Sequence, residues 1–515
     1  MNMAEKPCRW GTNMYRKPTG QISLLEDFRF FAGGKLDANN RWVKMADLIP
    51  WDIVEDRYAS HFPKHTGNVA KPVRVALGSL IIKEKCGFSD EETVQQIMEN
   101  PYLQYFIGLE EFQTTPPFDS SSMVHFRKRL DAKVIAELNE ALCKGKTTTE
   151  TQDHNDQNTP PPSSGCTDDN RREDKASSEQ PPQQNHGKLI LDATCTPADV
   201  KYPTDFSLLN DAREKLEAMV DTLHENQIGK ELKPRTYRQK ARKLYLKLEK
   251  NRKPRSREIR KAIRKQLSFV ARDLQIVLRL SAKYPEGLSK RQQKDLETIQ
   301  TLFEQQKTMY DQRVHTIEHR IVSISQPHVR PIVRGKKTAA TEFGAKVAIS
   351  IVNGYAWIEK LSWEAFNEGT SLVESVETYK KRHGNYPESV IADKIYRNRD
   401  NLQYCKLHGI RLNGPKLGRP SKDKKEHLEQ RRLEKQEAGL RNAVEAKFGE
   451  GKRCYGLGRI MARLKETSET VIGLQFIIMN LGKRLRDLLS LFWEMAFLSG
   501  KFVYCLKTEN MGTVQ

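Results

Sequence analysis

Residues 145–187 constrain the fold of this chain most strongly, because they contain almost nothing that can form a core. Thr, Ser, Pro, Gln, Asn and Asp dominate the stretch, which includes Pro160-Pro161-Pro162. A segment with so little apolar surface cannot offset the entropy lost when it is ordered. We therefore expect a disordered polar linker over 145–187, with separately folded regions on either side. At 515 residues the chain is long enough for two to four such regions.

Residues 1–144 are predicted to form an all-helical domain. Apolar residues from Val73 recur at helical spacing up to Gly87, a residue typical of helix C-termini. Ser89-Asp90-Glu91-Glu92 is a capping box that starts a second helix, and a third helix carries basic residues. This order is typical of a helix-turn-helix DNA-binding unit, with an ordinary helical bundle as the alternative. The candidate DNA contacts here are Arg127, Lys128 and Arg129.

The apolar pattern becomes strand-like at Lys188. Leu189-Ile190-Leu191 leads into Asp192, and Val390-Ile391-Ala392 leads into Asp393. Each pattern predicts a short buried strand that ends in an aspartate.

Further strands are expected over 321–324, 329–333, 345–352 and 355–358. The last two are joined by Asn353-Gly354, which is a strong hairpin signal. With helices between the strands, we predict an α/β domain with a mixed sheet, built from residues 188–206 and 321–485.

Residues 207–320 interrupt this domain as a helical insertion, and they carry the highest charge density. Residues 230–265 contain 17 Lys or Arg and 3 Glu, in a chain of net charge +21 and pI about 9.4. Such an excess favours nucleic acid, because Lys and Arg displace counterions from phosphates. A solvated helix face is the alternative, but basic and acidic residues would then alternate. The candidate DNA contacts of this basic arm are Arg242, Lys243, Arg252 and Lys253.

Three acids could form a metal centre in the predicted sheet domain. If the strands before Asp192 and Asp393 are neighbours, the two carboxylates emerge side by side, and Glu445 lies on an amphipathic helix that could pack across them. Mg²⁺ prefers oxygen ligands, and two such ions roughly 3.5–4 Å apart can serve phosphoryl transfer. The alternatives are a turn or cap role for each aspartate and a surface ion pair between Arg441 and Glu445. Glu434, Glu437 and Glu450 are also candidates for the third acid.

Several motifs resemble those of insertion-sequence-five-like DDE transposases, and specifically the group typified by insertion sequence eleven-eighty-two. The stretch from Lys71 to Leu130 is similar to their N-terminal domain. Leu191-Asp192-Ala193-Thr194, Ala392-Asp393-Lys394-Ile395-Tyr396, and Arg441 to Gly449 resemble the segments around their three catalytic acids. The related pattern has a tyrosine where this chain has Ala438, and its long insertion follows the second acid instead of the first.

The resemblance implies an RNase-H-like catalytic domain. Asp192, Asp393 and Glu445 would be catalytic ligands of Mg²⁺, for which Mn²⁺ can substitute, and Arg441, Lys452 and Arg453 would contact DNA. It also implies terminal inverted repeats and target DNA as partners, a homodimer in the synaptic complex, and a bacterial, nucleoid-associated location.

The cysteines and the chain ends favour a cytoplasmic protein without a membrane partner. The eight cysteines form no CxxC pair, and the N-terminus lacks an apolar signal core. Charged residues interrupt the apolar segment Leu485 to Leu506, which we therefore interpret as a core helix within a C-terminal helix and tail over 486–515.

Three other functions fit parts of the sequence. These are a non-catalytic sequence-specific DNA-binding relative, an RNase-H-like nuclease without strand transfer, and a coiled-coil scaffold. The scaffold leaves both predicted strand-end aspartates without a role.

Overall fold

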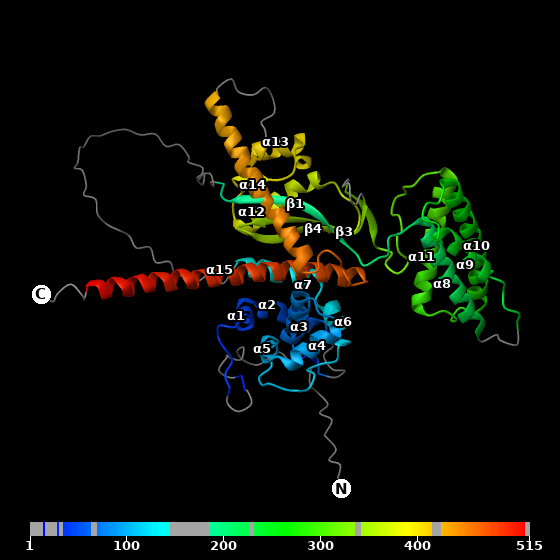
Figure 1. Cartoon of the computed structure of the whole chain (residues 1–515), viewed down its shortest axis with the longest axis horizontal. Helices are drawn as coiled ribbons and strands as arrows, with labels where there is room; N and C mark the ends of the chain where they lie inside the picture. Colours follow the sequence, from blue (N-terminus) through cyan, green and yellow to red (C-terminus); the bar gives the residue numbers. More distant parts are fainter. Residues whose placement is uncertain are drawn as a thin grey trace, which may run out of the picture.

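The computed structural model describes residues 14–15, 28–29, 34–62, 69–144, 185–225, 231–334, 341–414 and 424–509. All but the last three residues of the expected linker therefore lie outside the described residues. Figure 1 shows an N-terminal helical unit, a sheet with its covering helices, a separate helical bundle, and the long helix α15 between the first two.

The N-terminal unit is all-helical, as predicted from its periodicity. Gly87 ends one helix in the left-handed conformation (φ 73°), which glycine adopts without strain. The Ser89 side chain caps the next by accepting a hydrogen bond from the Glu92 amide. The helices are α1 (Arg41–Leu48), α2 (Asp52–Ser60), α3 (Val73–Cys86), α4 (Asp90–Glu99), α5 (Pro101–Phe106), α6 (Ser122–Arg129) and α7 (Ala132–Lys144).

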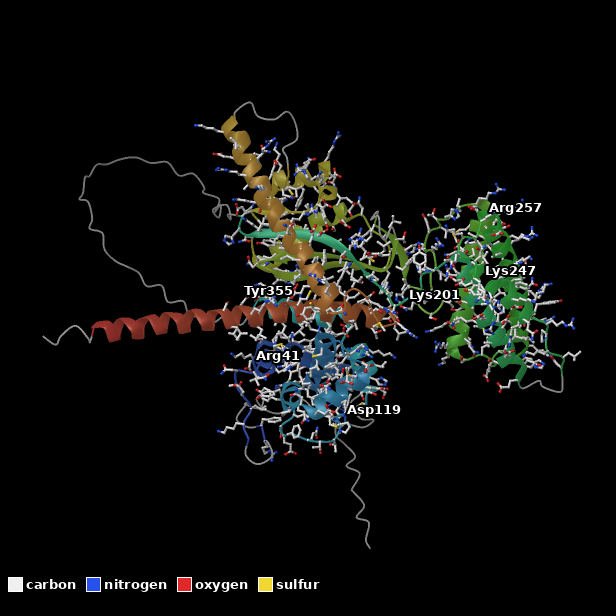
Figure 2. The ribbon with its side chains drawn as sticks, viewed as in Figure 1. Arg41, Asp119, Lys201, Lys247, Arg257 and Tyr355 are labelled. Carbon is white, nitrogen blue, oxygen red and sulfur yellow. The ribbon has the colours of Figure 1, made fainter. Side chains whose placement is uncertain are left out.

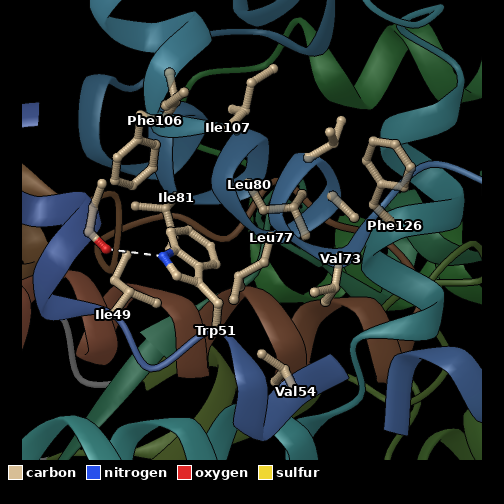
Figure 3. Packing of buried hydrophobic residues seen from close by; sticks show 14 of the residues in the cluster. Ile49, Trp51, Val54, Val73, Leu77, Leu80, Ile81, Phe106, Ile107 and Phe126 are labelled. Atoms are coloured by element: carbon tan, nitrogen blue, oxygen red, sulfur yellow. Dashed lines mark hydrogen bonds between the residues drawn. The ribbon is translucent and has the colours of Figure 1, made fainter. Parts of the chain in front are cut away.

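Helix α3 lies at the centre of this unit and is buried on most of its circumference. Leu77, Leu80 and Ile81 are fully buried, and Phe106 packs beside them (Figure 3). The Trp51 indole in the same core donates a hydrogen bond of 2.9 Å to the Ala46 carbonyl. Helix α3 is therefore the core helix of this unit.

A mixed sheet forms the second region. Strand β1 pairs with β3 antiparallel and with β5 parallel, and the order across the sheet is β2-β3-β1-β5-β6, with β4 also paired to β3. Asn353 and Gly354 form the predicted hairpin turn, both at positive φ. The strands are β1 (Lys188–Pro197), β2 (Arg330–Val333), β3 (Thr341–Val352), β4 (Tyr355–Ser362), β5 (Ser389–Ile391) and β6 (Arg411–Leu412).

Two sequence predictions for the strands are wrong. Residues 321–324 form no strand, because Val322 packs into the core beneath the sheet whereas Ile321 and Ile324 pack into the helical insertion. Strand β1 does not end at Asp192 but continues to Pro197, since β3 pairs with it over that length.

Helices cover both faces of the sheet. On one face, α12 (Leu372–His383) and α13 (Arg399–Leu407) pack against Leu191 and Val390. On the other, α14 (Lys424–Cys454) and the first part of α15 (Lys465–Glu509) pack against Ile190 and Ile391. Side chains alternate along a strand, so the two faces of β1 belong to different cores.

The helical insertion has its own core and stands apart from the sheet (Figure 1). It consists of α8 (Asp205–Glu225), α9 (Arg238–Glu249), α10 (Ser256–Lys283) and α11 (Lys290–Gln312). The long helical stretch predicted here is therefore a bundle of four helices, with the basic arm on α9 and the start of α10.

Helix α15 joins the N-terminal unit to the sheet region. Leu474, Ile477 and Leu481 belong to the N-terminal core, whereas Ile472 and Phe476 belong to the core beneath the sheet. The segment Leu485 to Leu506 is helical as predicted, and Leu485 is buried in the N-terminal core, but the burial of the side chains from residue 491 onward lies outside what the structure describes. Beyond Leu485, the backbone continues as a helix past the other described elements (Figure 1). In the described part of the chain, no helix is long and apolar enough to span a bilayer.

Candidate active site

The pairing of β1 with β5 brings two of the predicted acids side by side. Ile190 lies opposite Ile391 in this parallel pair, and Asp192 and Asp393 each follow two residues later. A step of two keeps a side chain on the same face of a strand. Both carboxylates are thus expected on the face covered by α14.

Asp192 is a largely buried carboxylate. Burial raises its pKa to about 6, with a further raising contribution from the nearby Glu368 and Asp393 and a lowering one from the Ala193 amide and Arg441. The Ala193 amide donates to its Oδ1 at 2.8 Å. Among the described residues Asp192 has no ion-pair partner within salt-bridge distance, so its negative charge is poorly compensated.

Asp393 is held at the end of β5 by local hydrogen bonds. Its Oδ1 caps a short 3-10 helix by accepting from the Lys394 amide at 2.7 Å. The residue before Asp393, Ala392, forms two backbone hydrogen bonds with the Asn413 side chain. Asn413 donates to the Ala392 carbonyl (3.0 Å) and accepts from the Ala392 amide (2.9 Å). The Asp393 side chain remains 47% exposed, which leaves it accessible to a ligand.

Glu445 lies on α14 and is linked to Asp393 by Arg441, which pairs with both carboxylates. The Arg441 guanidinium lies 3.1 Å from Asp393 Oδ1 and 3.6 Å from Glu445 Oε1. Val444 and Phe448 are buried beneath the sheet and fix this helix in place. Leu440, one turn before Val444, is exposed.

The other acids of α14 have different partners. Glu437 is buried and pairs with Arg411 at 3.1 Å, and Glu450 pairs with Lys447. Glu434 accepts a hydrogen bond from Gln430. Among these candidates, Glu445 is the acid that shares an arginine with Asp393.

The three acids do not form a closed ligand set as they stand. No group of three or more His, Cys, Asp or Glu in the described ranges is arranged to hold a metal. Arg441 provides the positive charge between Asp393 and Glu445 instead. Both carboxylates remain open to solvent, with Glu445 63% exposed, so the arginine does not bury them.

A fourth acid near the site was not predicted from the sequence. Glu368 is mostly buried, forms an ion pair of 2.9 Å with Lys346 of β3, and raises the pKa of Asp192. It is the first residue of the short 3-10 helix Glu368–Ser371, which follows β4 and is too short to show an apolar periodicity. No sequence pattern of the kind used above could have identified it.

The predicted DNA contacts on α14 and α6 differ in their availability. Arg453 is exposed and donates to the Gly449 carbonyl, whereas Lys452 is half-buried. On α6, Lys128 is exposed, but Arg127 is held by Asp90 through two hydrogen bonds of 2.9 and 2.6 Å. Arg129 lies over the Phe62 ring. Arg127 and Arg129 therefore stabilise the N-terminal unit in this structure.

The four predicted contacts of the basic arm are all exposed: Arg242, Lys243, Arg252 and Lys253. None of them pairs with a described carboxylate. Figure 2 shows side chains of this unit, including Lys247 and Arg257, projecting from its helices into solvent. The arm is not adjacent to the acidic site, because the insertion stands apart from the sheet (Figure 1).

Two family models match this chain. A model described as Transposase DDE domain matches residues 390–482, which include Asp393, Arg441 and Glu445. A model described as Transposase domain (DUF772) matches residues 31–129, which include α1 to α6.

A curated protein is also similar to part of the chain. It is an uncharacterized protein, ORF8 in the nfe locus of Rhizobium meliloti, and it is 32% identical over 140 residues. The match covers 26% of this chain and 64% of the relative, so the chain spans less than two thirds of that relative's length. No solved structure matches.

Proposed function

We propose that this protein is the transposase of a bacterial insertion sequence of the insertion-sequence-five-like type. It binds the terminal inverted repeats, cleaves the element ends and joins the freed 3′-OH to target DNA. The two transposase-domain matches support a DDE transposase, a class of metal-dependent polynucleotidyl transferases. The observation that carries the proposal is the β1–β5 register, which aligns Asp192 with Asp393 beneath α14.

The sheet supports an RNase-H-like catalytic domain. Three antiparallel strands (β4, β3 and β1) are followed across the sheet by two parallel ones, β5 and β6. The acids come from the two central strands, β1 and β5, where they lie closest together.

The donor set fits a hard divalent cation. Asp192 is a buried carboxylate without a paired cation, and the accessible Asp393 and Glu445 add oxygen donors. We propose that these three residues hold Mg²⁺, with Mn²⁺ as a substitute. The chemistry supplied by the cations when bound is activation of the attacking hydroxyl and neutralisation of the leaving oxygen.

The chain's own residues position the DNA and the acids. Arg441 orients Asp393 and Glu445 and, being partly exposed, can contact a phosphate with the donors that remain. Arg453 and Lys452 follow on the same helix and extend this contact. The N-terminal unit, through Lys128, and the basic arm contribute phosphate contacts away from the reaction, and a homodimer would hold two element ends together.

The test is cleavage and joining of labelled DNA carrying the inverted repeats that flank the gene. Asp192→Ala, Asp393→Ala and Glu445→Ala should each lose both nicked and joined products, by a factor of about 10³ or more. Glu434→Ala, on the same helix, is the matched control and should retain activity.

Three outcomes would contradict the proposal. Retained activity in any of the three variants removes that acid from the reaction. Nicked products without joined strands in the wild-type protein would instead indicate a nuclease without strand transfer, and binding without either product would indicate a non-catalytic relative.

A further inference from the structure

A cavity of about 310 Å³ lies in the helical insertion, between the start of α10 and the end of α11. Residues 256–263 line one wall, and residues 306–315 line the other. The Arg257 side chain, labelled in Figure 2, marks this end of the insertion. The volume is at the lower end of the range for cavities that bind small ligands. We call it the α10–α11 cavity.

Two arginines bring positive charge to the α10–α11 cavity. Arg260 donates to the Tyr310 carbonyl at 3.1 Å, and its guanidinium carbon lies 4.2 Å from the centroid of the Tyr310 ring. Arg313 is exposed and ends α11 at a positive φ of 58°, which is uncommon for a residue other than glycine. In the part of the chain that the structure describes, neither guanidinium pairs with a carboxylate. Both are therefore available to a phosphate, which arginine binds through paired hydrogen bonds.

The carboxylate in the cavity wall is already neutralised. Asp205 accepts hydrogen bonds from Arg320 (2.7 Å) and from Gln306 (3.0 Å). Arg320 also donates to the His315 carbonyl at 2.9 Å, which ties the segment after α11 to the start of α8. Asp205 therefore holds this wall in place without opposing an anion in the cavity.

Much of the remaining wall is apolar. Ile259 and Ile263 lie one turn apart on α10, Met309 of α11 is buried, and Val314 at the rim is 40% exposed. A phosphate alone needs no apolar wall. A guanidinium stacked on a tyrosine ring beside such a wall suits a nucleobase, because bases pack their flat faces on aromatic rings and on guanidinium planes.

We infer that the α10–α11 cavity binds a nucleoside phosphate. Arg260 and Arg313 hold the phosphate, and the base packs against the apolar wall and the stacked Tyr310. The α10 wall belongs to the basic arm, so a nucleotide of a DNA strand bound along the arm is the expected source. That source rests on the proposed DNA partner, whereas a free nucleotide, the other source, has the same chemistry.

Photo-cross-linking of the full-length protein without metal tests the inference and separates the two sources. One probe is an oligothymidylate strand that contains 5-iodo-deoxyuridine, and the other is free 5-iodo-dUMP. Cross-linked peptides are mapped by mass spectrometry. The strand should cross-link within residues 306–315, at Tyr310. A cross-link from the free nucleotide at the same residue would identify a free nucleotide as the ligand.

Variants separate the cavity from the general charge of the arm. Val314→Phe fills the cavity without changing charge and should reduce the cross-link roughly tenfold, because the base loses its stacking contact. Arg313→Ala should reduce it by a similar factor. Tyr310→Phe keeps the ring and should cross-link as wild type does. Arg279→Ala, an exposed arginine near the other end of α10, is the control and should change nothing.

Two results would overturn the inference. The first is no cross-link in either wall of the cavity with either probe, although the strand binds the protein. The second is a cross-link that Val314→Phe leaves unchanged, which would place the nucleotide outside the cavity. Because the assay contains no metal, a protein without transposase activity can still give the cross-link. Failure of the proposed function and failure of this inference are therefore distinguishable.

Discussion

Asp192 and Asp273 are both acids whose pKa is raised by burial, yet their surroundings differ. Asp192 lies beside two other carboxylates and an arginine at an accessible site. Asp273 lies inside the insertion bundle, where burial and the negative charge of Glu217 raise its pKa to about 7 and Arg213 partly offsets them. Neither Asp273 oxygen has a hydrogen-bond partner among the described residues. The surroundings of Asp192 fit a ligand site, whereas the unpaired, buried carboxylate of Asp273 lowers the stability of the bundle.

Asp192→Asn should stabilise the metal-free protein while removing its activity. A carboxyl whose folded pKa is raised binds more protons in the folded state, so stability falls as pH rises from about 4 to about 6. The amide does not titrate, and it should gain roughly 1–2 kcal/mol over wild type at pH 8 and less at pH 5. Urea unfolding without metal measures this difference, and an equal gain at both pH values would refute it.

Asp273→Asn should show the same sign over a wider range, without loss of activity. Its pKa of about 7 extends the fall in stability up to pH 7. We expect roughly 2–3 kcal/mol of protection at pH 8, measured by hydrogen exchange of α8 and α10 amides, and a smaller gain at pH 5. Glu304→Gln is a matched exposed control. A destabilised Asp273→Asn bundle would show that the carboxylate has a favourable partner.

At the level of elements, sequence patterns predicted the parts of the site that follow apolar periodicity. The strands before Asp192 and Asp393 and the helix of Glu445 were found because buried strands and amphipathic helices have regular spacing. Asn413 and Glu368 were missed because neither lies in an element with an apolar periodicity: Asn413 follows β6, and Glu368 begins a four-residue 3-10 helix. The end of β1 was misplaced because it depends on the length of β3, a partner distant in the sequence.

The two hydrogen bonds between the Asn413 side chain and the Ala392 backbone lead to a prediction about the position of Asp393. Asn413→Ala removes both hydrogen bonds to Ala392 and should let the Asp393 carboxylate move. Because a shift of about 1 Å can cost about 100-fold, we expect cleavage to fall by a factor of 10 to 100 with unchanged DNA binding. Asn413→Asp restores only the acceptor and should recover part of the loss. Wild-type rates in Asn413→Ala would exclude a positioning role.

The whole molecule separates the acidic site from its most basic surface. The site lies at the sheet, whereas the basic arm lies in an insertion that stands apart from it (Figure 1). This distance could not be predicted from the sequence, because nothing in the charge pattern records how a bundle is oriented. Phosphate contacts on the arm should therefore affect affinity more than chemistry.

Substitution of the arm should change how DNA affinity depends on salt. Replacing Arg242, Lys243, Arg252 and Lys253 by Ala should lower the slope of log K against log salt by roughly 2 to 4. The same four-charge change on α11, at Lys290, Arg291, Lys294 and Lys307, is the matched control. If the two variants show equal slopes, the effect comes from the net charge of the protein, and the basic arm does not contact phosphates.

The most direct test of the central claim is a metal switch at Asp393. Asp393→Cys replaces a hard oxygen donor with a soft sulfur, which disfavours Mg²⁺ more than Mn²⁺. If Asp393 is a metal ligand, cleavage of labelled element-end DNA should be lost with Mg²⁺ and partly restored with Mn²⁺, whereas Asp400→Cys on the exposed face of α13 should behave as wild type. Full activity of Asp393→Cys with Mg²⁺, or equal loss with both ions, would contradict the account.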